Sequence, residues 1–398
     1  MSVERLPPFT LAMVGAEGAG KTSLVAALAL ASRGHLGETT APWGPSVFLH
    51  GQRRPEWPPP RTSFTTWTAL RTSRRRYLAL DTPGRADGFI QAAGALACCD
   101  GALLVVDAGK VKTSTLTGYC AAARMERPAR AVALTHCEGV DAGALDRAEQ
   151  AARGELASAG GDPDEVAVHR VRSRAALRGD AVALAGVRAL LDVVESWHDP
   201  ARDLDGELRV TVLESFVGPK ELNLAGVLRR GAVRAGDGVW IATSANAERL
   251  TVTEVKRDGE AVALASAGEA AMVTLTGPSV VLRATRARAL TGARPRRPRE
   301  LVATVRGVNG RRGQRVFEPG AVFFAVVGAT EGRVTLREGE VRAGEETRVR
   351  LAPWAEAWWE AGTPVVLRGP RRTGLASSAS GVVAVGEAAV AEGLYAGP

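Results

Sequence analysis

Hydrophobic and polar positions change their pattern once along the chain, near its midpoint. In the first half, short apolar runs predict strands at Phe9–Val14, Arg76–Leu80, Ala102–Asp107, Ala129–Leu134 and Glu165–Val171. Alanine-rich segments with helical spacing separate most of these runs, at Lys21–Ala31, Ile90–Ala97, Leu116–Met125, Ala142–Ala157 and Ala181–Glu195. This alternation is typical of an α/β fold with a doubly wound, mostly parallel sheet.

The second half contains short β-type runs separated by Gly, Asp and Pro. These runs lie at Leu208–Leu213, Gly238–Thr243, Ala271–Leu275, Val322–Val327, Thr347–Leu351 and Val365–Arg368. They predict all-β structure of the sandwich or barrel type. A Pro- and Arg-rich segment at Gly292–Arg299 is too polar for a core strand and predicts a linker. We therefore expect three domains, over residues 1–200, 205–290 and 297–398, the last two being β-barrels.

Composition supports a globular, multidomain protein. The 398 residues exceed one ordinary core, and 45% hydrophobic with 24% charged residues is typical of folded chains. No apolar run reaches the length of about 20 residues that spans a bilayer. The opening segment MSVERLPPFT has no apolar signal region. We expect a cytoplasmic protein without a membrane partner. The four cysteines lack the paired spacing of a zinc site.

A glycine-rich motif follows the first predicted strand. Residues 15–22 read GAEGAGKT, which fits GxxxxGKT between a strand and a helix. Backbone N–H groups of such a loop surround phosphate oxygens at the positive end of the helix. Lys21 is expected to reach the β- and γ-phosphates, and the Thr22 hydroxyl is expected to ligate Mg²⁺. The candidate phosphate-binding residues are Gly15, Gly18, Ala19, Gly20, Lys21, Thr22 and Ser23.

A second motif, Asp81-Thr82-Pro83-Gly84, follows the predicted strand Arg76–Leu80. The Asp81 carboxylate can hold a Mg²⁺-bound water, and the Gly84 N–H can meet a γ-phosphate. Alone, DxPG is a common turn sequence. In combination with the GxxxxGKT loop, the DTPG motif indicates a binding site for a nucleoside triphosphate with Mg²⁺.

Several segments together resemble the elongation factor Tu family of translational GTPases. Residues 74–108 resemble the family's switch region and following strand, while residues 225–231 and 235–237 resemble its second domain. The segments 332–336, 343–345 and 362–368 resemble its third domain. The resemblance implies a G domain followed by two β-barrels, GTP and GDP with Mg²⁺ as cofactors, and tRNA, the ribosome or a protein as partners.

The resemblance assigns catalytic and metal roles, and it also exposes substitutions. Counting back from Asp81, Thr62 falls where the family has its switch I threonine, a Mg²⁺ ligand. Arg85 stands where the family has a histidine that orients the attacking water. Because arginine stays protonated, it cannot accept a hydrogen bond from water, although it can stabilise phosphate charge. Lys21 and Arg85 are therefore the candidate catalytic residues, and we expect slow hydrolysis. Glu17 and Arg61 replace two apolar gate residues, and we hypothesise that they pair.

The guanine-reading motif of the family is also altered. Its Asn-Lys-x-Asp pattern corresponds to Thr135-His136-Cys137-Glu138. Glu138 keeps a carboxylate for guanine but carries one more methylene than Asp, so guanine preference is expected to be weak. The last base-contacting element is assigned to Ser173 and Arg174 of the sequence Ser-Arg-Ala.

Charge and loop length leave the RNA partner open. The net charge of +8 attracts polyanions, but an arginine-rich coding bias explains it equally well. The runs Arg74–Arg76 and Arg294–Arg299 fit RNA phosphates, and they also fit solvated edges that block aggregation. The loop after Gly277 is shorter than its family counterpart, so tRNA binding does not carry over directly.

Three interpretations remain open from the sequence. The first is a GTPase that resembles elongation factor Tu, engages RNA or the ribosome and turns over slowly. The second is a pseudo-GTPase, with the fold retained as a scaffold for protein or RNA. The third is a P-loop enzyme for another nucleotide.

Overall fold

A computed structural model of the protein describes about two thirds of the chain. The described residues are 7–33, 65–85, 89–111, 129–158, 162, 164, 166–218, 220–242, 247–257, 259–277, 289–294, 300–307, 316–327, 330–353, 363–368 and 382–389.

The first domain is built on a six-stranded sheet in the order β2-β3-β1-β4-β5-β6. Its strands are β1 (Phe9–Val14), β2 (Thr66–Arg71), β3 (Arg76–Asp81), β4 (Gly101–Asp107), β5 (Ala129–Thr135) and β6 (Ala167–Arg170). Neighbouring strands from β3 to β6 are parallel, and β2 alone runs antiparallel to β3. The predicted α/β fold with a mostly parallel sheet is thus confirmed. The edge strand β2 was not predicted.

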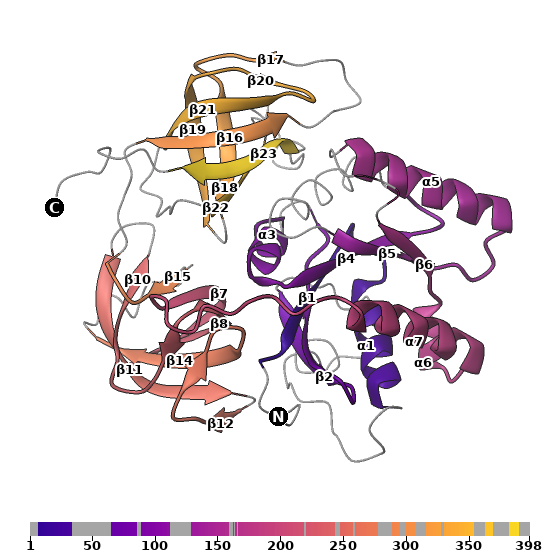
Figure 1. Cartoon of the computed structure of the whole chain (residues 1–398), viewed down its shortest axis with the longest axis horizontal. Helices are drawn as coiled ribbons and strands as arrows, with labels where there is room; N and C mark the ends of the chain where they lie inside the picture. Colours follow the sequence, from indigo (N-terminus) through magenta and orange to yellow (C-terminus); the bar gives the residue numbers. More distant parts are fainter. Residues whose placement is uncertain are drawn as a thin grey trace. The chain divides into compact units, whose positions relative to one another are not determined.

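Helices cover both faces of this sheet. They are α1 (Lys21–Arg33), α3 (Phe89–Cys98), α5 (Ala142–Ser158), α6 (Ser173–Leu177) and α7 (Ala181–Glu195). Helices α1, α6 and α7 pack together on one side of the sheet, and α3 and α5 lie on the other (Figure 1). The helix expected at Leu116–Met125 lies outside the described residues.

The central strands are apolar on both faces because helices cover both sides. All six residues of β1 are buried, and they read FTLAMV without polar alternation. Such continuous apolar runs are typical of parallel strands. Leu11, Met13, Leu103 and Val105 join residues of α1 and α7 in one core. This core fixes the carboxyl ends of the strands, which carry the candidate site.

The second domain is a ring of antiparallel strands. Its main strands pair in the order β10-β15-β7-β8-β14-β11-β12, and β10 also pairs with β11, which closes the ring. Its strands are β7 (Arg209–Val217), β8 (Leu222–Arg230), β9 (Ala232–Val233), β10 (Gly238–Ala242), β11 (Ala247–Arg257), β12 (Glu260–Ala261), β13 (Ala265–Ser266), β14 (Ala270–Thr276) and β15 (Ala289–Thr291).

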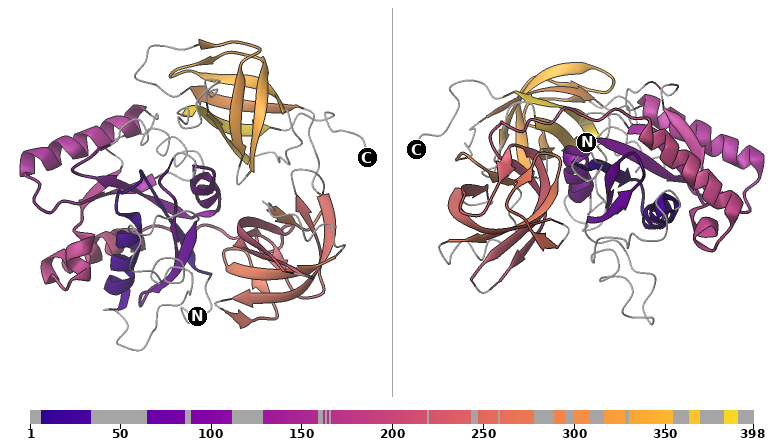
Figure 2. Two further views of the ribbon diagram at one scale, coloured as in Figure 1. Left: turned by 180° about the vertical axis from the view of Figure 1, so that it is seen from behind. Right: turned by 60° about the horizontal axis from the view of Figure 1, so that its bottom comes forward.

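The third domain is a closed barrel in the order β16-β21-β19-β18-β22-β23. Figure 2 shows its strands from two further sides. Its strands are β16 (Leu301–Gly307), β17 (Val316–Phe317), β18 (Val322–Val327), β19 (Thr330–Glu338), β20 (Val341–Arg342), β21 (Glu346–Pro353), β22 (Thr363–Arg368) and β23 (Val382–Ala389). The prediction of β-barrel structure after the first domain is confirmed. No helix in the described part of the chain is long and apolar enough to cross a membrane.

A buried ion pair anchors the segment that leaves the first domain. The Asp100 carboxylate is fully buried and accepts hydrogen bonds from both terminal nitrogens of Arg202, at 2.6 and 2.8 Å. It also accepts the backbone N–H of Thr10 at 2.8 Å. Arg75 holds the same segment further back, because it donates to the Trp197 carbonyl at 2.7 Å and lies 3.3 Å from the Asp199 carboxylate. The end of the first domain is therefore tied to the start of β1 and β4.

Candidate nucleotide-binding site

The candidate residues gather at the carboxyl ends of the parallel strands. The GxxxxGKT loop joins β1 to α1, the DTPG turn follows β3, and Thr135–Glu138 follows β5. Parallel strands of a doubly wound sheet end at one edge, which is where such folds bind ligands. The structure therefore brings the two phosphate motifs and the start of the altered base-reading motif to the same edge.

Close backbone contacts explain two of the glycines. A Cβ added to Gly15 would lie 2.1 Å from the Val105 carbonyl oxygen. A Cβ added to Gly84 would lie 2.5 Å from backbone atoms of Ala16 and Glu17 and from the Lys21 ammonium. Any side chain at either position would push the loop out of place. The two motifs are thus packed directly against each other.

Lys21, the candidate phosphate-binding lysine, is buried inside the loop. Its ammonium group donates hydrogen bonds to the carbonyls of Gly15, at 3.0 Å, and Ala16, at 2.9 Å. Burial lowers the pKa of this ammonium to about 8, while the charges of Asp81 and Glu17 act in the opposite direction. An ammonium held in a low-dielectric loop interacts strongly with an anion placed beside it.

Thr22 and Asp81, the two candidate Mg²⁺ residues of the motifs, are hydrogen-bonded to each other. The Thr22 hydroxyl donates to the Asp81 carboxylate at 2.5 Å, and Asp81 itself is buried. Thr82 fixes the start of the turn, because its hydroxyl donates to the Met13 carbonyl of β1 at 2.6 Å. Oxygen donors of this kind suit Mg²⁺, which prefers carboxylate and hydroxyl ligands together with phosphate oxygens. The donor set therefore fits a Mg²⁺–nucleotide complex.

Of the remaining predicted catalytic and gate residues, the structure describes some and leaves others out. Arg85 is exposed directly after the Gly84 turn, and Glu17 is exposed on the phosphate loop. Thr62 and Arg61 lie outside the described residues, so the third Mg²⁺ ligand and the Glu17–Arg61 pair stay predictions. Ser23 is half-buried in the first turn of α1.

Thr135 has a structural role that the sequence analysis did not anticipate. Its hydroxyl lies 2.6 Å from the Ala19 carbonyl of the phosphate loop and 3.0 Å from the Val106 carbonyl of β4, and the two carbonyls share its single hydrogen. The residue is 1% exposed. Thr135 therefore joins three segments of the site: the loop, β4 and β5.

His136 also contacts another residue of the protein. Its Nδ1 atom lies 3.1 Å from the Asp107 carboxylate at the end of β4. Its φ of 53° is the only positive value for a non-glycine residue in the described part of the chain. A left-handed backbone at a non-glycine residue is uncommon and is often found at functional sites. Sequence reasoning had not included Asp107 in the site, because neither motif contains it.

The other base-contacting candidates differ in exposure. Glu138 is exposed in the turn after β5. Ser173 is buried at the start of α6, and its hydroxyl has no hydrogen-bond partner among the described residues. Arg174 is exposed beside it. A buried hydroxyl without a partner is costly unless a ligand or water satisfies it.

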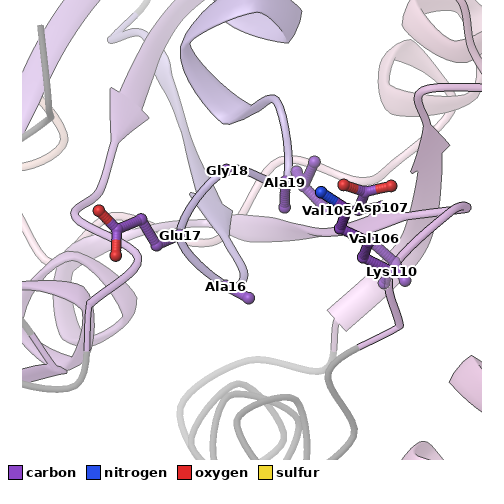
Figure 3. A pocket seen from close by; sticks show the side chains of 8 residues that line it. All are labelled: Ala16, Glu17, Gly18, Ala19, Val105, Val106, Asp107 and Lys110. Carbon is purple, nitrogen blue, oxygen red and sulfur yellow. The ribbon is translucent and has the colours of Figure 1, made fainter. Parts of the chain in front are cut away.

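A pocket of about 150 Å³ opens between the phosphate loop and the end of β4. Figure 3 shows Glu17 on one side of it, with Asp107 and Lys110 together on the other. The sequence analysis missed Lys110 as well as Asp107. Asp107 is the last residue of β4 and Lys110 lies three residues after it, and this position at a strand end is the signal that could have identified both. The lining residues are Ala16, Glu17, Gly18, Ala19, Val105, Val106, Asp107 and Lys110.

Residues 8–200 match the family model described as the elongation factor Tu GTP binding domain. Translation elongation factor SelB from Methanococcus maripaludis, solved with the GTP analogue GppNHp, is 16% identical with a TM-score of 0.73. The match covers 98% of this chain and 79% of that one. Its apo form is 15% identical with the same TM-score of 0.73. A bacterial selenocysteine-specific elongation factor, EF-Sec, is 16% identical with a TM-score of 0.70, over 96% of this chain and 58% of that one. At these identities the solved structures show a shared fold.

The Thr135 contacts generate the first prediction. Thr135→Val keeps the shape of the side chain but removes the single hydroxyl hydrogen that the Ala19 and Val106 carbonyls share, at a cost of about 1–3 kcal/mol. Thr135→Ser keeps the hydroxyl and should lose much less. Native-state hydrogen exchange of peptides from the phosphate loop and β5 measures this local opening free energy. Equal protection in the two variants would contradict the assigned role of the hydroxyl.

Proposed function

The chain belongs to the elongation factor Tu family of translational GTPases, and from this we propose that it binds GTP and GDP with Mg²⁺ and hydrolyses GTP slowly. The observation that carries the proposal is the intact phosphate end of the site. Lys21 is buried within the loop, and Thr22 is bonded to Asp81 across the two motifs. Burial of an ammonium group is costly, and a phosphate bound beside it would offset that cost.

Each residue of the phosphate end has a separate task in this proposal. The loop amides and Lys21 bind the β- and γ-phosphates, and the Gly84 N–H orients the γ-phosphate. Bound Mg²⁺, held by Thr22, Asp81 and Thr62, would neutralise phosphate charge. The close packing of Gly84 against Ala16 and Glu17 keeps the two motifs in contact.

Slow hydrolysis follows from the residue after the turn. Arg85 occupies the position of the family's water-orienting histidine and is exposed. Its guanidinium can stabilise negative charge on the phosphates but has no lone pair to accept a proton from water. Proton transfer by a positioned group contributes roughly 10²–10⁴ to rates, so its loss predicts slow turnover.

Weak guanine selection is supported by how Thr135 and His136 are used. Both bond inside the protein, to the Ala19 carbonyl and to the Asp107 carboxylate. Base selection then depends on Glu138 together with Ser173 and Arg174, whose roles we propose on family position. A second candidate is a P-loop NTPase of changed base specificity, and the intact phosphate end favours it over a scaffold without nucleotide.

A role in translation is proposed on family grounds. SelB and EF-Sec are named as elongation factors, the latter as selenocysteine-specific. We propose that this chain acts on tRNA, the ribosome or a related RNA in the cytoplasm. The altered switch and base-reading motifs argue for a specialised factor.

Nucleotide binding is tested by calorimetric titration of stripped protein with GTP, GDP and ATP in the presence of Mg²⁺. We expect micromolar or tighter binding of GTP and GDP, with a smaller preference over ATP than the family motif would give. Lys21→Ala should weaken affinity at least about 100-fold, because it removes a charge-assisted phosphate contact. Lys220→Ala, a change at an exposed lysine of the second domain, is the matched control. Parental affinity in Lys21→Ala would refute the proposal.

The pKa of Lys21 predicts a pH dependence of phosphate binding. Below about pH 8 the ammonium is already protonated, so this group adds no pH dependence. A bound phosphate raises the pKa, so above pH 8 binding takes up a proton and Kd rises by up to about tenfold per pH unit. Titrations with GDP between about pH 7 and 9, in buffers of different ionisation enthalpy, measure the uptake. Lys21→Arg cannot titrate in this range and should remove the added slope.

The Arg85 substitution predicts a gain of turnover. Arg85→His restores a group that can orient water, and should raise single-turnover GTP hydrolysis roughly 10- to 100-fold without changing affinity. Phosphate release from a preformed GTP complex measures this rate. Arg85→Gln is the control, because it removes the charge without supplying an imidazole. An equal rise in both variants would show that charge removal, and not water orientation, limits the parent.

A further inference from the structure

An exposed apolar region lies where helices α6 and α7 of the first domain meet. Leu177, the last residue of α6, is 42% exposed, and Val182, near the start of α7, is 74% exposed. The two residues flank a short turn at Gly179 and Asp180, and the two helices pack against each other (Figure 1). Leu and Val are usually buried, and exposed apolar side chains that are grouped, unlike single ones, indicate an interaction surface.

The solvent face of α7 continues this apolar region. The residues of α7 that pack into the domain core are Ala183, Val187, Leu190, Leu191 and Val194. The exposed residues on its other side are Ala181, Val182, Ala185, Arg188, Ala189 and Asp192. A helix that faces water normally carries polar residues on its outer side. Because four of these six exposed positions are apolar, the composition of α7 is that of a helix with a partner on both faces.

Positive charge accompanies the exposed apolar residues. Arg178 follows α6 directly and Arg188 lies in α7; both are exposed, and neither forms an ion pair with a carboxylate in the part of the chain that the structure describes. The nearby Asp180 is already engaged, because its carboxylate caps α7 through a hydrogen bond of 2.9 Å and lies 3.5 Å from Arg172. Asp192 is the one exposed acid of α7. The region therefore has more arginines than available carboxylates, which favours an acidic partner.

The combination of apolar and positive groups selects the class of partner. Aliphatic side chains such as Leu177 and Val182 offer packing contacts to apolar residues of another protein, whereas RNA bases stack on aromatic rings and guanidinium planes. The inner face of α7 is packed against the domain core, so this helix is not available to lie in a bilayer surface as free amphipathic helices do. The alanines of α7 allow a second helix to approach closely, because the distance between packed helices depends on the side chains at the contact.

We propose that this region, which we name the α6–α7 corner, binds an acidic amphipathic helix of a partner protein. The residues of the corner are Leu177, Arg178, Val182, Ala185 and Arg188. Apolar side chains of the partner helix pack on Leu177 and Val182, and its carboxylates lie beside the two arginines. In such a contact the apolar centre supplies most of the affinity, while the charges at the rim steer association. The proposal goes beyond nucleotide binding and does not depend on it.

Fluorescence anisotropy tests the proposal with the full chain, free of nucleotide, and a labelled helical peptide of about 18 residues, with leucines on one face and glutamates flanking them. Leu177→Ser and Val182→Ser should each weaken binding roughly tenfold, with the salt dependence unchanged. The double variant Arg178→Glu/Arg188→Glu should weaken binding mainly at low salt, because salt screens the lost attraction. A peptide with lysines in place of the glutamates should bind this double variant more tightly than it binds the parent chain.

Matched controls come from the other domains. Leu264 of the second domain is 42% exposed, as Leu177 is, and Arg337 of the third domain is exposed. Leu264→Ser and Arg337→Glu should therefore leave the affinity for the peptide unchanged. Circular dichroism melts show whether each variant is folded. If Leu177→Ser melts early, Val182→Ser carries the apolar test, because the Val182 side chain is the more exposed of the two.

Losses confined to the corner variants, together with the reversed preference for the lysine peptide, support the proposal. No binding of the glutamate peptide to the parent chain at about 100 μM overturns it. Equal binding of a scrambled peptide of the same composition, or an equal loss of affinity in the control variants, also overturns it. Single-stranded RNA or anionic lipid vesicles that bind with the same dependence on Val182, while the peptide does not, identify another class of partner and overturn it as well.

Discussion

The close approach of the phosphate loop to its neighbours is the constraint on which the candidate site depends. Gly15 lies against the Val105 carbonyl so tightly that no Cβ fits, and Gly84 lies against Ala16 and Glu17 in the same way. In this packed arrangement Lys21 is buried and Thr22 is bonded to Asp81. Because the loop is fixed by its neighbours, substitutions in the base-reading motif can accumulate while the phosphate end keeps its geometry.

Much of this arrangement could be predicted from sequence because it rests on local motifs. GxxxxGKT and DTPG specify backbone shape through glycines, and the structure brings Lys21, Thr22 and Asp81 of the two motifs together at one edge of the sheet. The strand β2 was missed because TWTALR mixes polar and apolar residues on an edge, where one face is only partly covered. Asp107 and Lys110 were missed because they belong to no motif and join the site only through the parallel pairing of β1 with β4.

The altered base-reading motif shows that a substitution relative to the family pattern does not by itself reveal the role of the new residue. From sequence, Thr135 is a lost contact to guanine; in the structure it is a buried donor to Ala19 and Val106. His136 likewise replaces a lysine but pairs with Asp107, a residue more than 25 positions away. Long-range pairs of this kind depend on strand register, which a single sequence does not reveal. A substitution that weakens one function can therefore carry a different, structural one.

The ion pair between Asp100 and Arg202 has a consequence for separating the domains. A fragment that stops at residue 200, where the family match also ends, would lack Arg202. Asp100 would then remain buried with one hydrogen-bond donor, the Thr10 N–H, because both Arg202 donors would be lost. Loss of one partner of a buried ion pair costs about 3–5 kcal/mol. Since whole domains are stable by only about 5–15 kcal/mol, such a fragment would be marginal. Arg202 therefore contributes to the stability of the first domain, two residues beyond the end of its sequence signature.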